Sequence, residues 1–107
     1  AYDRGRAYNH VLAEAARQDA LGWTARVRLA GGRITLAVTD REGRPVQGVA
    51  EAYLQRPIEG TRVELGTSTP REGFAAPDIA SGQWEFRGFL LDGHGQRLDI
   101  RQRLIFP

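Results

Sequence analysis

The hydrophobic residues of this chain change their period at Trp23, and this change limits the folds that the chain can adopt. Before it, apolar residues recur at the steps of one helical face, namely Tyr8, Val11, Leu12, Ala15, Ala16 and Ala20. Asp3 can cap the first turn, and Gly22 is placed to end the helix in a left-handed conformation. Residues 1–22 are therefore expected to form an amphipathic α-helix, whose shallow face can pack on a sheet or on a partner helix.

After Trp23, apolar and polar residues alternate with a period of two, which is typical of strands that bury one face. Gly31-Gly32 predicts a tight turn between the first two strands. We expect strands at residues 24–29, 34–39, 46–55, 61–67, 78–80, 84–91 and 97–106. About seven short strands predict a mainly β chain, with an immunoglobulin-like β-sandwich over residues 23–107 after the N-terminal helix.

Alternation also assigns residues to the two faces of each strand. The core is expected to contain Trp23, Trp84, Phe86 and Phe106, because sandwich cores place large side chains at alternate positions. Residues 85, 87, 89 and 91 fall on the opposite face of their strand. In the last strand, Gln102 shares its face with the apolar residues Leu98, Ile100, Leu104 and Phe106.

Composition excludes several classes of function. All 15 basic residues are arginines, but they are interleaved with 13 acidic residues and leave a net charge of only +2. Nucleic-acid binders more often concentrate their basic residues in a stripe, so we expect no nucleic-acid partner. The chain has no cysteine, which excludes disulfides and thiolate-based zinc, iron–sulfur and redox sites.

The few potential catalytic or metal-binding residues are scattered. His10 and His94 are far apart in the sequence, and nothing in their spacing suggests a hydrolytic triad or a ligand cluster. Asp40, Glu42 and Asp92 lie in turns, where acidic side chains usually bond to the backbone of the turn. Without cysteine or methionine, the chain also lacks the ligands that Cu(I) prefers. We expect no catalytic residues, no cofactor and no metal site.

The beginning of the chain carries a further expectation. It opens on Ala1 and contains no methionine, so we expect that a preceding segment was removed and that this segment was a membrane anchor. Tyr2 and Tyr8 would then lie near a membrane surface, where tyrosines are common. Packing between the helix and the sandwich is an equally good interpretation of Tyr8.

Five segments together resemble the periplasmic part of FixH-family (CcoH) proteins over nearly the whole chain. They are residues 2–9 (YDRGRAYN), 20–23 (ALGW), 38–49 (VTDREGRPVQGV), 54–57 (LQRP) and 82–86 (GQWEF). The first two are the more specific, since the turn segment resembles a stretch found in many immunoglobulin-like periplasmic domains.

The resemblance implies a single-pass inner-membrane protein whose soluble domain lies in the periplasm. It further implies a non-enzymatic role in assembly of the cbb3-type cytochrome c oxidase, alongside a copper-transporting P-type ATPase. Oxidase subunits are the expected partners, with that ATPase as a further candidate. The contact candidates are Tyr2, Tyr8, Asn9 and Arg56, although Asn9 is equally readable as a helix-surface residue and Arg56 as an ion-pair partner of Glu59.

Two other functions stay open at the level of the sequence. One is a periplasmic module that binds copper or a small ligand, which would require His10 or His94 to meet carboxylates in space. The other is a sandwich attached to a separate catalytic domain. The sequence does not indicate the oligomeric state.

Overall fold

The computed structural model describes the backbone of residues 2–107 and the side chains of residues 9–107. One helix, α1 (Tyr2–Leu21), precedes the strands. The strands are β1 (Thr24–Ala30), β2 (Arg33–Thr39), β3 (Val49–Gln55), β4 (Arg62–Ser68), β5 (Phe74–Ala75), β6 (Gly82–Leu91) and β7 (Arg97–Phe106).

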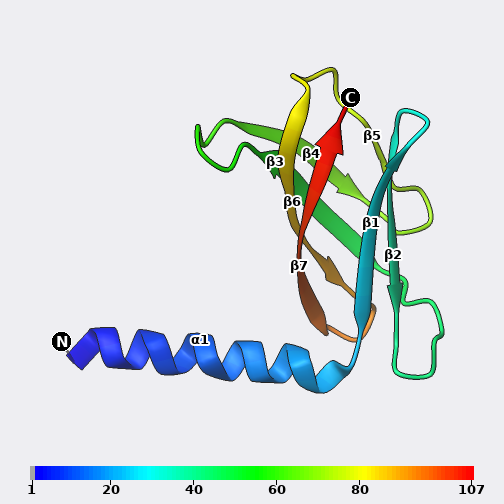
Figure 1. Cartoon of the computed structure of the whole chain (residues 1–107). Coiled ribbons are helices and arrows are strands. Elements are labelled where there is room, and N and C mark those ends of the chain that lie inside the picture. Colours follow the sequence, from blue (N-terminus) through cyan, green and yellow to red (C-terminus); the bar gives the residue numbers. More distant parts are fainter. Residues whose placement is uncertain (1) are drawn as a thin grey trace.

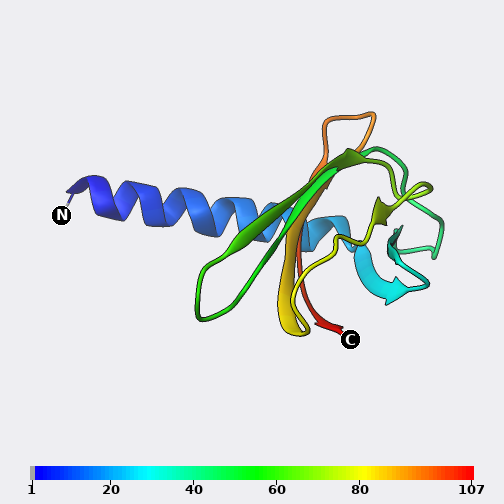
Figure 2. The same cartoon turned by 90° about the horizontal axis from the view of Figure 1, so that it is seen from above.

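The strands form two antiparallel sheets that pack against each other (Figures 1 and 2). The three-stranded sheet has the order β1-β2-β5, and the four-stranded sheet has the order β4-β3-β6-β7. Gly31 and Gly32 join β1 to β2 with φ of 58° and 74°, the positive values that this two-residue turn requires. The seven strands confirm the expected immunoglobulin-like sandwich.

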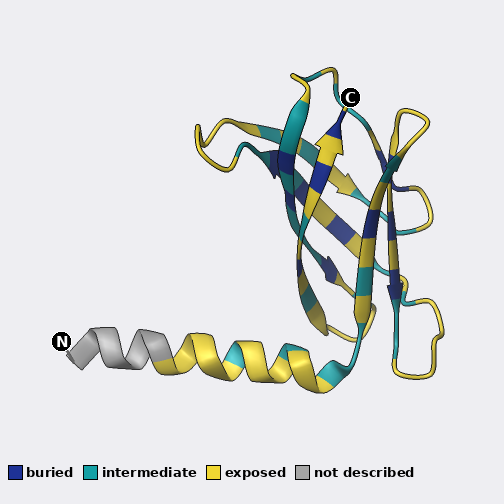
Figure 3. Ribbon diagram, in the orientation of Figure 1, coloured by how far each residue is buried: buried dark blue, intermediate teal, exposed yellow. Residues whose placement is uncertain are grey.

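Inward side chains of both sheets form one hydrophobic core, visible as dark blue bands along the strands in Figure 3. Trp84, Phe86 and Phe106 are buried as expected, and Trp23 is half-buried against the same cluster. Aromatic rings meet edge to face, with centroids 6.1 Å apart for Phe74 and Phe86 and 6.5 Å apart for Trp84 and Phe106. The remaining buried core residues are Val27, Ile34, Leu36, Val38, Ala50, Ala52, Leu54, Leu90, Ile100 and Leu104.

Gln102 connects the two sheets at one side of the sandwich. It points inward from β7, as its place in the alternation predicts. Its side-chain oxygen accepts a hydrogen bond from the Val27 backbone N–H at 2.9 Å, and its Nε2 donates to the Val27 carbonyl at 2.6 Å. The amide thus pairs with the free edge of β1 as a neighbouring strand would, which satisfies backbone groups that would otherwise lack partners.

The short fifth strand was predicted at residues 78–80, and that prediction is wrong. The strand lies at Phe74–Ala75, where the buried Phe74 pairs with Ile34 of β2. Pro77 has no N–H to donate to a sheet, and the Ala80 carbonyl accepts a hydrogen bond from the Trp84 indole at 2.8 Å instead.

The third strand begins at Val49 rather than at residue 46 as predicted. Just before it, the backbone at Gly48 passes so close to the end of β6 that a Cβ there would lie 2.9 Å from Asp92 Cα. Pro45 forms only an isolated bridge with Thr39. The close crossing separates this segment from the ladder that follows.

Candidate functional site

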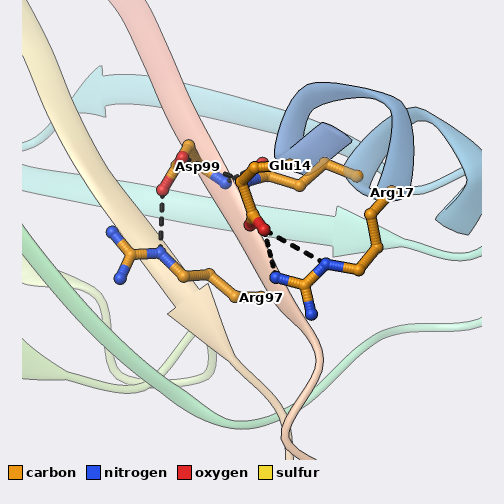
Figure 4. A network of polar contacts seen from close by, with 5 residues as sticks. Glu14, Arg17, Arg97 and Asp99 are labelled. Carbon is orange, nitrogen blue, oxygen red and sulfur yellow. Dashed lines mark hydrogen bonds and ion pairs between the residues drawn. The ribbon is translucent and has the colours of Figure 1, made fainter. Parts of the chain in front are cut away.

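Helix α1 extends away from the sandwich, and a polar network near its C-terminal end fixes the direction in which it leaves (Figures 1 and 4). The Gln18 side-chain oxygen accepts a hydrogen bond from the Asp99 N–H at 2.6 Å, and Gln18 Nε2 donates to Asp99 Oδ2 at 3.0 Å. Gln18 also donates to Glu14 at 2.9 Å, Glu14 pairs with Arg17, and Arg97 pairs with Asp99 at 2.9 Å. Hydrogen bonds from Gln18 and then Arg17 hold the pKa of Glu14 below its usual value.

The C-terminal end of α1 is capped from the turn that follows β2. Gly22 has φ of 70°, which ends the helix as the sequence predicted. The Arg41 guanidinium donates hydrogen bonds to the carbonyls of Ala20, at 2.7 Å, and Leu21, at 3.5 Å. A cation at these unpaired carbonyls also suits the negative end of the helix dipole. The junction between helix and sandwich is therefore held by two independent sets of contacts.

The apolar face of α1 is exposed along its described part. Val11 is 63% exposed and Leu12 is 50% exposed, and Ala15 and Ala16 are exposed as well. The face does not pack on the sheet, which was one of the two expected arrangements, and packing on a partner helix stays a prediction. Asn9 is exposed beside this face. The side chains of Tyr2 and Tyr8 lie outside the described residues.

Most arginines on the outer face of the four-stranded sheet pair with acids of the same face. Arg87 of β6 lies directly opposite Arg101 of β7, and Glu85 pairs with both, at 2.6 Å and 2.9 Å. Its hydrogen bond with Arg101 is the largest of the effects that lower the pKa of Glu85. A hydrogen bond with Tyr53 raises the pKa of Arg87, and the charge of Glu85 acts in the same direction. A single carboxylate thus offsets the repulsion between two facing guanidiniums.

Two aromatic rings on the same outer face are covered by arginines. The Arg62 guanidinium lies 3.6 Å from the centre of the Tyr53 ring, and that of Arg97 lies 4.1 Å from the centre of Phe89. The rings line an open hollow of about 530 Å³. The alternation of β6 had placed Phe89 outward, but it gave no indication of which side chain would cover the ring.

Arg56 has internal contacts that the sequence did not indicate. Its guanidinium donates to the carbonyls of Ser81, at 2.7 Å, and Gln83, at 3.1 Å, and lies 4.7 Å from the centre of the Trp84 ring. The alternative interpretation was an ion pair with Glu59, and none of the ion pairs among the described residues joins the two. These bonds hold the start of β6 against the end of β3.

The acids in the turns bond to their own backbone. Asp40 Oδ1 accepts hydrogen bonds from two backbone N–H groups of its turn, at 3.0 Å and 2.9 Å, and Asp92 Oδ1 accepts two at 2.9 Å and 2.8 Å. His94 lies exposed in the Asp92 turn, and His10 is exposed on α1. Within the described residues, no group of three His, Cys, Asp or Glu side chains is arranged to hold a metal ion.

The fold and these surfaces define a class, an immunoglobulin-like sandwich presented on one long N-terminal helix. Comparison with known families identifies the chain more closely, because the family model for FixH matches residues 1–104 of the 107. The chain therefore belongs to the FixH family. Searches of curated proteins and of solved structures gave no significant match. Among the described residues, no helix is apolar enough over a sufficient length to cross a membrane.

Proposed function

We propose that this chain is the periplasmic part of a membrane-tethered, non-catalytic protein that assists assembly or maturation of a cbb3-type cytochrome c oxidase. Membership of the FixH family supports this proposal. The main structural support for it is the orientation of α1. The helix is fixed to the sandwich at its C-terminal end and exposes its apolar face. A helix held in this way can act as a stalk and leave one side free for a partner.

The dimensions of the stalk suit such a role. The 20 residues of α1 span about 30 Å at 1.5 Å per residue. With a membrane anchor before its N-terminus, the helix would hold the sandwich about that far from the inner membrane. A helix or loop of an oxidase subunit could then lie against the stalk while the sandwich contacts the periplasmic part of the same complex.

Most of the proposed contacts belong to α1, whose described part exposes an apolar face. Asn9 is adjacent to this face, and Tyr2 and Tyr8 belong to the same helix. Val11 and Leu12 are the exposed apolar residues that a partner would cover, because burying such side chains stabilises a complex. Arg56 is occupied by Ser81 and Gln83, so its proposed role is to support the fold beneath a contact. Oxidase subunits, and the copper-transporting ATPase, are the proposed partners.

Affinity purification of the tagged full-length protein from native membranes tests this function. We expect oxidase subunits to co-purify with the intact protein and to be lost when residues 1–107, which hold both α1 and the sandwich, are deleted. A finer test compares Leu12→Glu with His10→Glu, since both positions are exposed on α1 and each variant introduces one carboxylate. At 3.6 residues per turn, residues 10 and 12 project from nearly opposite sides of the helix. Leu12→Glu should reduce the co-purified oxidase, and His10→Glu should not.

Two results would overturn the proposal. One is a normal level of active cbb3 oxidase in a strain that lacks the protein. The other is a purified protein that carries stoichiometric copper and no oxidase subunit, which would favour a copper-binding module instead.

A further inference from the structure

The outer face of the three-stranded sheet carries a group of arginines that differs from those on the other sheet. Arg26 and Arg28 alternate outward along β1, and Arg33 points outward from β2. The register places Arg28 opposite Thr35 and Arg33 opposite Ala30, so the three guanidiniums share one exposed surface. We call Arg26, Arg28 and Arg33, with the short residues between them, the basic face.

No carboxylate lies on the outward positions of β1 and β2. The residues between the arginines are Thr24, Ala30, Thr35 and Ala37. All five ion pairs within the described part of the chain lie on α1 or on the four-stranded sheet, and none includes an arginine of the basic face. Arg33 donates to the Glu72 backbone carbonyl, which leaves its charge unneutralised. The basic face therefore differs from the opposite face in charge balance as well as in position.

The shape of the basic face suits contact with an extended acidic segment. Alanine and threonine side chains are short, so they project little from the sheet between the arginines, and a second chain can approach the backbone there closely. Guanidinium groups bind carboxylates through two parallel hydrogen bonds, and threonine hydroxyls add further donors and acceptors. Unneutralised positive charge also speeds the encounter with an acidic partner.

The position of the basic face relative to α1 indicates which anion it meets. In both views α1 extends toward the side of the four-stranded sheet, and β1 and β2 lie on the opposite side (Figures 1 and 2). If the N-terminus leads to the membrane, as the proposed function requires, then the basic face is turned away from the bilayer. Lipid headgroups of that bilayer would not reach it, and a protein segment could.

We propose that the basic face is a docking surface for a carboxylate-rich segment of a periplasmic partner protein. This inference rests on the proposed function for the orientation of the face and for the presence of a partner. The charge balance of the face is independent of that function. Arg26, Arg28 and Arg33 would each pair with an acidic side chain of the segment.

The direct test measures binding of a fluorescent decaglutamate peptide to the 107-residue chain by anisotropy. The test variant is Arg26→Gln/Arg28→Gln/Arg33→Gln. The control variant, Arg62→Gln/Arg97→Gln/Arg103→Gln, removes the same number of charges from the outer face of the four-stranded sheet. We expect the test variant to bind about tenfold more weakly than the wild type and the control to bind within about twofold. Binding should weaken as salt screens the contact.

Equal weakening in both triple variants would overturn the inference, because net charge alone would then explain binding. A test variant that binds like the wild type would also overturn it. Binding of the wild type to phosphatidylglycerol vesicles through these arginines, with no peptide binding, would replace the protein segment by a lipid surface. The peptide assay needs no oxidase. A negative peptide result therefore does not affect the co-purification test of the proposed function, and a negative co-purification result does not affect the peptide assay.

Discussion

Gln102 makes a contact whose removal has a calculable cost. In Gln102→Leu, a side chain of similar size replaces the amide, so the main loss is the pair of hydrogen bonds to Val27 at 2.9 Å and 2.6 Å. Each of the two Val27 backbone groups would be left without a partner at the half-buried edge of β1, at about 1–3 kcal/mol per group. Because water can reach part of this edge, we expect a total loss of about 2–4 kcal/mol in the free energy of unfolding.

Urea denaturation followed by tryptophan fluorescence measures this loss, and thermal unfolding should show a decrease of roughly 10–20 °C in Tm. Gln96→Leu is the matched control, because Gln96 is an exposed turn residue whose backbone N–H, rather than its side chain, bonds to Asp92. The control should unfold within about 0.5 kcal/mol of the wild type. If Gln102→Leu did the same, the amide would not be needed to close the sandwich.

Three further substitutions test other parts of the structure. Gly88→Ala should cost about 1–3 kcal/mol in urea denaturation, because a Cβ at this position would overlap the Glu51 carbonyl of the neighbouring strand. The pKa of Glu85 is lowered on folding, so the carboxylate contributes to stability above about pH 4.5 and loses this contribution as the pH falls below that value. The difference in unfolding free energy between the wild type and Glu85→Gln should therefore shrink in acid. Gln18→Ala should broaden the distance distribution between spin labels on α1 and on the sandwich, because Asp99 loses both of its bonds to the helix.

Each of these substitutions has a matched control on the same chain. Gly93→Ala is suitable for the first, since nothing lies within 4 Å of a Cβ there. Glu51→Gln removes a carboxylate that takes part in none of the ion pairs among the described residues, and Gln47→Ala removes an exposed amide. The reasoning would be wrong if a control shifted as much as its partner, or if Gln18→Ala left the distances between the labels unchanged.

The period of the hydrophobic residues was sufficient to predict the helix, the sandwich and the inward face of its longest strands. Those features depend on which side chains avoid water, and alternation reports this directly. Trp84, Phe86 and Phe106 are buried for that reason. Gly31-Gly32 was equally informative, because two consecutive positive φ angles are adopted mainly by pairs made of glycine, asparagine or aspartate.

The short fifth strand could not be placed in this way. Two residues are too few to show a period, and the contact that defines the strand is a pairing with Ile34, 40 positions earlier in the chain than Phe74. Local composition also favoured a later position, residues 78–80, although Pro77 directly before them has no N–H to donate to a sheet. Pairing between distant segments is a property of the folded chain, and here it determined where the fifth strand lies.

The candidate surfaces were only partly predictable. Alternation identified which residues point outward, including Phe89, but it did not show which arginines meet acids. The Glu85 contacts with Arg87 and Arg101 depend on the register of two strands. The direction of α1 depends on the bonds between Gln18 and Asp99, which are 81 positions apart and carry no sequence signal.

The two outer faces use arginine for different purposes, and the register explains why. On the four-stranded sheet, Arg87 faces Arg101 directly, and Glu85, two residues before Arg87 on the same strand, pairs with both and limits their repulsion, so these charges are committed to folding. On the three-stranded sheet, Arg28 faces Thr35, and no acid is required for the sheet to form. Arginines that contribute no ion pair to the fold, on the side of the sandwich opposite to the stalk, remain available for another molecule.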